Sequence, residues 1–374
     1  MVFPSVGENH QKNANLMRKT KKAILTLEDG STFEGISFGA ETSHSGEVVF
    51  NTAMTAYPES LTDPSYLGQI LVSTYPIIGN YGVPPREDCE GLSRYLESER
   101  IHPEAIICQD YSWNYSHWDA ASSLGDWLKE EKVVGVAGID TRALTKVLRE
   151  KGSMLGKVVV DGCDDVPFYD PNRENLVAKA SCREVMEYGA GNPKRVLLLD
   201  CGVKHNIIRC LVRRGAHVIR VPWDFDIDTV DYDGLFISNG PGNPTFAHRA
   251  VESIRRAFAI GKPICGICMG NQLLSIAAGA KVYKLKYGHR SQNQPVRELG
   301  TNHCFVTSQN HGFAVDTTTL DKDWEPYFEN MNDGTNEGIR HKTKPFFSTQ
   351  FHPEACGGPT DTEFIFDKFI DLLK

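Results

Sequence analysis

The C-terminal half of the chain alternates short apolar runs with helical patterns, and this alternation constrains the fold more than any other feature. In order, the segments read "RVLLLDCG", "NIIRCLVRRG", "HVIRVP", "GLFISNGPGNP", "AVESIRRAFAIG" and "PICGIC". A continuous apolar run is typical of a strand that is buried on both faces. Strands alternating with helices predict right-handed βαβ units in a doubly wound, mostly parallel sheet, and hence an α/β domain. Ligands of such sheets bind beyond the carboxyl ends of the strands, where "SNGPGNP" and "GICMG" fall.

The preceding region has a different pattern and predicts a strand-rich α+β domain. "AILTLEDGSTFEGISFGA" alternates apolar and polar residues around a turn at 28–30, which is typical of a hairpin, and "GEVVFNTAM" and "QILVSTYP" resemble further strands. "DTRALTKVLREKG" predicts a helix that Asp140 or Thr141 caps and Gly152 ends.

The length of 374 residues favours two domains of roughly 150 to 200 residues each. Because the stretch from Asp161 to Pro193 is polar and aperiodic, we expect a linker in that region. The expected divisions are a disordered arm at 1–21, an N-terminal domain at 22–165, a linker at 166–193 and a C-terminal domain at 194–374.

Composition excludes several classes of protein. No apolar run approaches the ~20 residues of a membrane-spanning helix, and the formal net charge of -8 argues against a nucleic-acid surface. The N-terminal segment lacks the apolar region of a secretory signal and the pattern of a transit peptide. Ten cysteines without regular spacing fit a reducing compartment, so we expect a cytoplasmic protein.

The motif "GICMGNQ" places Cys268 between two glycines where a strand is expected to give way to a helix. A thiol at a helix N-terminus is favoured as the thiolate, and Gly266 and Gly270 would allow close packing around a tight corner. The amide of Met269 would then face an oxyanion formed at a carbonyl under attack. This pattern predicts a nucleophilic cysteine, although a lone cysteine in an apolar run is also common as inert packing.

Cys265 and Cys268 also form a Cys-x-x-Cys pair, which leaves two alternatives. The pair could be a thiol-disulfide redox site, since it follows an expected strand. It could also be half of a zinc site, but no second Cys-x-x-Cys or paired-histidine motif completes four ligands, and we expect no metal.

A nucleophilic thiol needs a base, and "FFSTQFHPEACGG" offers one in His352 with Glu354 two residues later. The carboxylate could hold one ring nitrogen of the imidazole and leave the other aimed at the sulfur. Taken alone, the tripeptide is weak evidence, and a solvated loop pair is then the favoured interpretation.

Two further motifs have both a binding and a structural interpretation. "SNGPGNP" lacks the endings of a P-loop and of a dinucleotide-binding loop, but the amides of Gly240 and Gly242 suit a carboxylate or an oxyanion. "SQNHGFAVD" presents Asn310 beside Gly312, which suits either a ligand contact or an ordinary turn.

The order of these four motifs resembles the class I (triad) glutamine amidotransferases. The segments "LEDGSTFEG", "GEVVFNTAMTAYPESLTDPSY", "YPIIGNYGV" and "GIDTRALTKVLREKG" are similar to the small-subunit (glutaminase) half of carbamoyl phosphate synthetase, from about Lys22 to the C-terminus. The resemblance implies that Cys268 is the nucleophile, His352 the general base and acid, and Glu354 the residue that orients it. It implies that glutamine is held by Ser65, Gly240, Gly242, Met269, Gln272, Asn310, Gly312 and Phe313.

The resemblance also implies a partner and a reaction. Glutamine would be hydrolysed through a glutamyl thioester, and the ammonia would pass to a synthetase that makes carbamoyl phosphate from bicarbonate and ATP. We expect no cofactor in this chain, with ATP, magnesium and potassium belonging to that large subunit or fused synthetase. The ending "TQFHPE" with "GPTDTEFIFDKF" is closest to the eukaryotic pyrimidine-pathway type, and the chain stops at Lys374, where the glutaminase half ends.

This sequence departs from the family pattern at two positions. Asn271 replaces a frequent histidine, and Ser291 replaces a frequent glycine. Since neither belongs to the triad, we expect effects on glutamine affinity and rate rather than on the chemistry. A non-catalytic docking scaffold is the remaining alternative, and the presence of all three triad residues argues against it.

Overall fold

The computed structural model describes residues 20–374, so the expected arm at 1–21 lies almost wholly outside the described residues. The chain forms two compact units. Of the described residues, the first unit contains 20–51, 68–86 and 103–170, and the second contains 52–67, 87–102 and 171–374. Two segments from the expected N-terminal domain, 52–67 and 87–102, are therefore part of the second unit.

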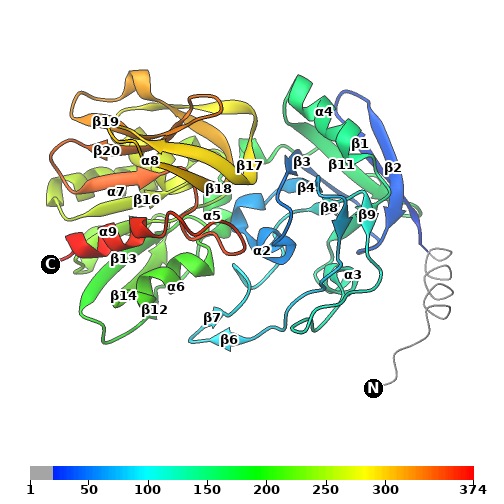
Figure 1. Cartoon of the computed structure of the whole chain (residues 1–374), viewed down its shortest axis with the longest axis horizontal. Coiled ribbons are helices and arrows are strands. Elements are labelled where there is room, and N and C mark those ends of the chain that lie inside the picture. Colours follow the sequence, from blue (N-terminus) through cyan, green and yellow to red (C-terminus); the bar gives the residue numbers. More distant parts are fainter. Residues whose placement is uncertain (1–19) are drawn as a thin grey trace. The chain divides into compact units, whose positions relative to one another are not determined.

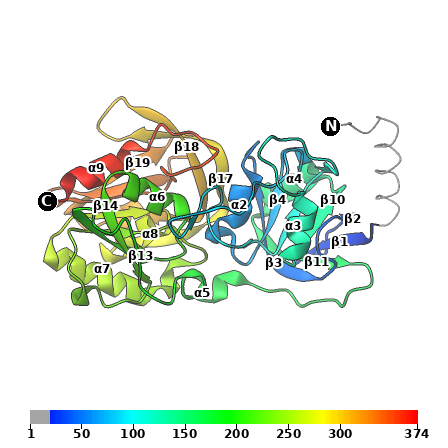
Figure 2. The same ribbon diagram turned by 90° about the horizontal axis from the view of Figure 1, so that it is seen from below.

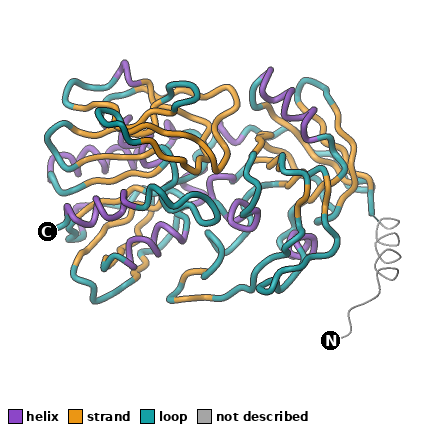
Figure 3. The backbone as a smooth tube through the Cα atoms, in the orientation of Figure 1, coloured by secondary structure: helices purple, strands orange, loops and turns teal. Residues whose placement is uncertain are grey.

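Seven strands of the first unit close into a barrel, in the order β1-β11-β3-β4-β8-β10-β2. Figure 3 draws strands in orange and helices in purple. The barrel strands are β1 (Lys22–Leu27), β2 (Thr32–Ser37), β3 (His44–Asn51), β4 (Gln69–Ser73), β8 (Ala105–Ile107), β10 (Val134–Ala137) and β11 (Met154–Val160). The unit also contains helices α3 (Leu124–Glu130) and α4 (Thr141–Lys151) and the paired short strands β5 (Ile77–Ile78) and β9 (Asp110–Tyr111).

The expected hairpin and helix of this unit are confirmed. β1 and β2 pair antiparallel, and Gly30 in their turn has a φ of 86°, which favours glycine. Asp140, rather than Thr141, caps α4 by accepting a hydrogen bond from the amide of Ala143 at 2.8 Å. Gly152 is the C-cap of the helix.

The second unit is built on a ten-stranded sheet in the order β12-β14-β13-β15-β16-β21-β20-β19-β17-β18 (Figure 1). Its strands are β12 (Met186–Tyr188), β13 (Lys194–Asp200), β14 (Ala216–Pro222), β15 (Gly234–Ile237), β16 (Ile264–Ile267), β17 (Lys281–Glu298), β18 (Cys304–Asp316), β19 (Trp324–Asn330), β20 (Asn336–His341) and β21 (Phe346–Thr349). Its helices are α2 (Tyr57–Thr62), α5 (Leu176–Ala180), α6 (His205–Arg213), α7 (His248–Ile260), α8 (Met269–Ala277) and α9 (Phe364–Leu372), and β6 (Asp88–Cys89) pairs with β7 (Leu92–Ser93).

The apolar runs form the parallel strands that the sequence predicts. β14, β13, β15, β16 and β21 are parallel neighbours. Alternate residues of β13 face opposite sides: Leu198 packs in the core cluster that contains residues of α6 and α9, and Leu197 in the cluster that contains residues of α7 and α8. The helices thus cover both faces of the parallel strands (Figure 2), as a doubly wound sheet requires.

Half of the sheet departs from the expected parallel arrangement. β20, β19, β17 and β18 extend it through antiparallel pairs, and β12 pairs antiparallel at the opposite edge. The segment expected to be a linker, 166–193, contains α5 and β12. Among residues 20–374, no helix has both the length and the apolar character to cross a membrane.

Candidate active site

Cys268 lies at a sharp corner between β16 and α8, as the sequence predicts. Its φ of 53° and ψ of -100° are strained for a residue with a side chain. The two glycines are required by close approach: a Cβ on Gly270 would lie 2.3 Å from the carbonyl oxygen of Ile237, and one on Gly266 would lie 2.6 Å from the backbone of Gly270. The corner can exist only because both positions lack side chains.

The corner buries the thiol and leaves helix amides near it. Cys268 is 2 % exposed, and its Sγ lies 3.6 Å from the carbonyl oxygen of Asn310. The amide of Cys268 donates to Thr349, whereas Met269 begins α8, where the amides of the first turn have no partner within the helix. The role of the Met269 amide towards an oxyanion stays a prediction.

The Gly-rich loop follows β15 and packs closely against the segment after β13. A Cβ on Gly240 would lie 2.1 Å from the carbonyl oxygen of Cys201, and Gly242 has a φ of 81°. Both positions therefore need glycine, and the loop lies beyond the carboxyl ends of the parallel strands, where ligands of such sheets bind.

His352 and Glu354 follow β21 and form a fully buried pair. His352 Nδ1 lies 2.7 Å from Glu354 Oε1, and the opposite nitrogen, Nε2, is buried without a hydrogen bond to any described residue. Burial and the Lys204 ammonium oppose ionisation of the imidazole, but Glu354 and the nearby Cys268 sulfur raise its pKa to about 10. Cys268 follows β16 and His352 follows β21, its parallel neighbour, so the sheet brings together a thiol and an imidazole that are more than eighty positions apart in sequence.

Lys204 is a site residue that the sequence analysis missed. Its Nζ lies 3.2 Å from Glu354 Oε1, 3.5 Å from Asp63 Oδ2 and 3.1 Å from His352 Nδ1. An ammonium can only donate, and Nδ1 uses its own proton for Glu354, so the lysine bonds the carboxylate and not the ring. Burial lowers the pKa of Lys204, but Asp63, Glu354 and Glu97 outweigh it and raise the pKa overall. Its place after β13, at the carboxyl edge of the sheet, was the signal that could have identified it.

Asp63 joins two of the expected glutamine-binding residues to this network. Its Oδ1 accepts from the amide of Ser65 at 2.9 Å, and its Oδ2 accepts from Asn310 Nδ2 at 3.0 Å. Asn239 Nδ2 donates to Ser65 Oγ at 3.0 Å. Burial alone would raise the pKa of Asp63, but Lys204 and His352 lower it, so the carboxylate stays charged. Ser65 and Asn310 thus meet around one carboxylate.

Gln272, on α8, is hydrogen-bonded to Phe313, on β18. Gln272 Nε2 donates to the backbone carbonyl oxygen of Phe313 and to the side-chain oxygen Oε1 of Gln350, each at 3.2 Å. A Cβ on Gly312 would meet only the end of the Arg290 side chain, at 3.3 Å. Gln272 therefore supports β18, the strand that carries Asn310, Gly312 and Phe313.

The two departures from the family pattern are both buried. Asn271 is fully buried, donates to Gln350 at 3.0 Å and accepts from Ser348 at 2.8 Å, so its amide is used in packing α8 against β21. Ser291 accepts a hydrogen bond from Gln294 at 2.8 Å within β17. Their expected effect on glutamine affinity and rate stays a prediction.

Comparisons with known proteins match both units. Residues 197–372 match the family described as glutamine amidotransferase class-I, and residues 25–158 match that described as carbamoyl-phosphate synthase small chain, CPSase domain. The carbamoyl phosphate synthase arginine-specific small chain of Saccharomyces cerevisiae is 51% identical over 365 residues, which span 94% of this chain and 89% of the relative.

Longer relatives match over a small part of their length. Carbamoyl-phosphate synthase [ammonia], mitochondrial, of Homo sapiens is 49% identical over 95% of this chain and 24% of its own length. The multifunctional protein CAD of Squalus acanthias is 51% identical over 94% of this chain and 16% of its own length. The chain therefore spans about a quarter or less of these longer proteins.

Proposed function

Since this chain belongs to the family of carbamoyl-phosphate synthase small chains, we propose that it hydrolyses L-glutamine and supplies the ammonia for carbamoyl phosphate synthesis. The observation that carries the proposal is that Cys268, at the N-terminus of α8, and His352 follow the neighbouring parallel strands β16 and β21, with His352 Nδ1 held by Glu354. This arrangement supports a nucleophile, a base and an orienting carboxylate, the three groups that this kind of covalent catalysis uses.

In the first half-reaction, the Cys268 thiol gives its proton to His352 Nε2 and the thiolate attacks the side-chain amide carbon of glutamine. Amides of Met269 and Gly240 stabilise the tetrahedral oxyanion, and one such donor contributes about 3 to 4 kcal/mol. His352 returns the proton to the departing nitrogen, so that ammonia leaves and a glutamyl thioester remains on Cys268.

In the second half-reaction, water replaces ammonia. His352 Nε2 removes a proton from the water as it attacks the thioester carbonyl, and the same proton then returns to the sulfur. Glu354 keeps the proton of Nδ1 in place throughout, which leaves Nε2 as the working nitrogen. The net reaction converts glutamine and water into glutamate and ammonia.

The eight residues named from the resemblance are proposed to bind glutamine. Ser65 and Asn310 lie around Asp63, and Gly240 and Gly242 lie in the loop after β15. Met269 and Gln272 belong to α8, and Gly312 and Phe313 to β18. The partner is proposed to be a synthetase, as a large subunit or as part of the same polypeptide, and ATP, magnesium and potassium belong there. The cytoplasm is the proposed compartment, and a pyrimidine or an arginine pathway the proposed use.

The test is a glutamine assay with a matched pair of cysteine variants. We expect Cys268→Ala to lower glutamine hydrolysis on the order of 10⁶-fold, because the nucleophile is lost, while the assembled synthetase still makes carbamoyl phosphate from free ammonia. Cys265→Ala is the control, since Cys265 is fully buried on β16 and burial raises its pKa. Equal loss of the glutamine- and ammonia-dependent reactions in Cys268→Ala would refute the division of labour.

The two cysteine variants also distinguish a glutaminase from the two alternative functions. A thiol oxidoreductase using Cys265 and Cys268 would need both sulfurs, so an alkylation titration would find them oxidised and reduced together. A docking scaffold would release no glutamate from glutamine at all.

A further inference from the structure

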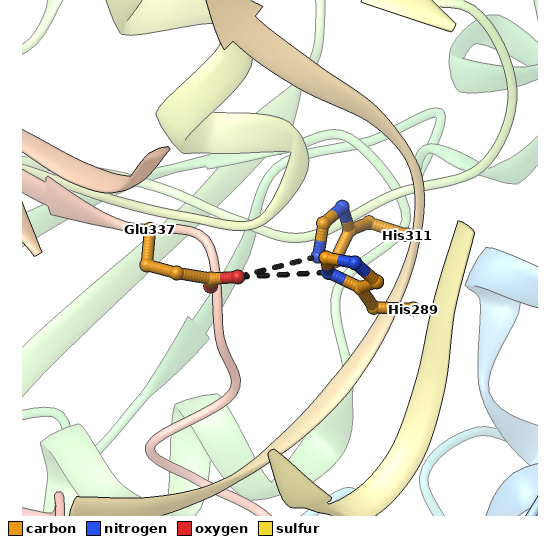
Figure 4. Close-up of side chains that lie close together, drawn as sticks. All are labelled: His289, His311 and Glu337. Carbon is orange, nitrogen blue, oxygen red and sulfur yellow. Dashed lines mark ion pairs between the residues drawn. The ribbon is translucent and has the colours of Figure 1, made fainter. Parts of the chain in front are cut away.

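A second cluster of buried ionisable groups lies in the antiparallel half of the sheet. His289 comes from β17, His311 from β18 and Glu337 from β20 (Figure 4). The carboxylate points at the two rings, and all three side chains are at most 10 % exposed. None of the three belongs to the proposed Cys268, His352 and Glu354 triad.

The separations within the cluster are unsuited to hydrogen bonds. Glu337 Oε1 lies 3.7 Å from His289 Nδ1 and 3.9 Å from His311 Nε2, whereas an N–H···O bond is about 2.7–3.2 Å long. Two ligands bound at about 2.0–2.2 Å to one tetrahedral ion are roughly 3.4 Å apart. The two carboxylate–imidazole separations therefore exceed the spacing of bound ligands by only about 0.3 and 0.5 Å, and one ligand atom from each residue lies within 4.8 Å of the others.

Each imidazole has its outer nitrogen held by an oxygen. His289 Nε2 lies 2.8 Å from Asp333 Oδ2, and His311 Nδ1 lies 2.8 Å from the carbonyl oxygen of Phe313. A neutral ring that donates on that side turns a lone pair inward on the other. This is how metal-binding histidines are oriented, by a carboxylate or a carbonyl behind the ring.

Two polar atoms of the cluster lack a hydrogen-bond partner, and a third faces an acceptor. His289 Nδ1 and Glu337 Oε2 are buried without a hydrogen bond to any described residue. His311 Nε2 faces an acceptor, Gln309 Oε1, at 3.2 Å. The Gln309 amide has this orientation because its nitrogen donates to Thr307 Oγ1, and the Thr307 hydroxyl in turn donates to the backbone carbonyl oxygen of Gln294. Lone pairs that converge in a buried space need a positive charge between them.

We propose that His289, His311 and Glu337 bind a divalent transition-metal ion of the zinc class. Two imidazoles and a carboxylate suit such an ion, with Asp333 behind His289 and Asn330, which donates to Glu337 Oε1 at 3.2 Å, behind the carboxylate. The ion would join β17, β18 and β20 one residue from Asn310, and so hold the strand that carries the proposed glutamine contacts.

A proton is the competing occupant. Burial lowers the pKa of His289, but Glu337 and Asp333 outweigh it and raise the pKa, so a protonated His289 could lie between the two carboxylates. Burial and the neighbouring His289 lower the pKa of His311 well below its ordinary value, which leaves its inward lone pair free in either case. If a metal ion occupies the cluster, the chain retains metal after desalting. If a proton occupies it, the chain retains none.

The test measures metal directly and does not depend on activity. The full chain is stripped with a chelator, loaded with Zn²⁺ or Co²⁺ and desalted, and its metal content and the visible absorption of the Co²⁺ form are recorded. We expect one ion per chain, lost in Glu337→Gln and bound about 10–100-fold more weakly in Asp333→Asn, which removes only a supporting contact at a partly exposed position.

Two controls fix the location. His303→Gln changes an exposed histidine that also lies beside a glutamate, Glu298, and should retain one ion. Cys268→Ala should also retain it, with no thiolate band in the Co²⁺ spectrum. Metal-free wild-type chain after loading, equal binding by Asp333→Asn and Glu337→Gln, or loss of the ion in Cys268→Ala would each overturn the proposal.

Discussion

At Cys268, one residue combines a strained backbone, burial and a proposed chemical role. Its positive φ is stabilised by the packing of Gly266 and Gly270 against neighbouring backbone, and the sequence predicted this corner because only glycine fits such approaches. Lys204 could not be predicted in the same way. Its place after β13 indicates the carboxyl edge of the sheet, but its partners Asp63 and Glu354 come from distant parts of the chain, so the sequence does not show that its charge is buried and paired.

Replacement of Lys204 should show how strongly that charge is coupled to its carboxylates. We expect Lys204→Met to lower the free energy of unfolding by about 3–5 kcal/mol, because Asp63 and Glu354 would be left buried without their cation. Adding Asp63→Asn should recover part of the loss. The measurement is denaturant unfolding at neutral pH, arranged as a double-mutant cycle.

The matched control is Lys262→Met, whose exposed ion pair with Asp231 should contribute only about 0–1 kcal/mol. If the effects of Lys204→Met and Asp63→Asn were strictly additive, the two charges would not be coupled and this account of the network would be wrong.

At the scale of elements, the sequence predicted those whose pattern is regular. The apolar runs became parallel strands, and the α4 pattern became a capped helix because local capping and periodicity agreed with the packing. The antiparallel extension was missed. β17 has register shifts between Lys284 and His289 and between Ser291 and Gln294, which break the two-residue alternation that identifies a strand.

The junction of β16 and α8 gives a test of an element boundary. We expect Gly270→Ala to lower glutamine hydrolysis about 10²-fold, because a Cβ placed 2.3 Å from the Ile237 carbonyl must displace the start of α8 and with it the sulfur. Overpacking should also cost about 1–3 kcal/mol in the free energy of unfolding. Steady-state kinetics and denaturant unfolding measure the two effects.

Gly358→Ala is the control, since its Cβ would make only ordinary contacts, the nearest at 3.4 Å to Ala355. A Gly270→Ala enzyme with full activity would mean that the corner tolerates the displacement, and the geometric argument for Cys268 would fail.

At the scale of the whole molecule, the two units are not consecutive stretches of sequence. Segments 52–67 and 87–102 pack with the second unit, so Asp63 and Ser65 reach a site whose other residues follow position 200. Composition and periodicity could divide the chain near residue 165, but they carry no information on such long-range contacts. The family resemblance placed Ser65 at the site, whereas the metal cluster, drawn from three strands without motif spacing, was not predicted at all.

The buried His352 and Glu354 pair should make the stability of the protein depend on pH in a defined direction. Burial opposes the charge on Glu354, but Lys204 and His352 lower its pKa from 4.5 to about 2, so this contribution is present above pH 4.5 and is lost towards pH 2. The pKa of His352 is raised from 6.5 to about 10, so its contribution is present below pH 6.5 and is lost as the pH rises to 10.

We therefore expect the thermal midpoint of the wild-type chain to fall between pH 6.5 and pH 10, and to fall less in His352→Gln, which has no proton to lose in that range. His303→Gln removes an exposed imidazole and should keep the wild-type slope. Differential scanning calorimetry across this interval measures all three chains. Parallel curves for the wild type and His352→Gln would mean that the imidazole has no raised pKa in the folded state, and that Glu354 and the Cys268 thiol do not stabilise its charge.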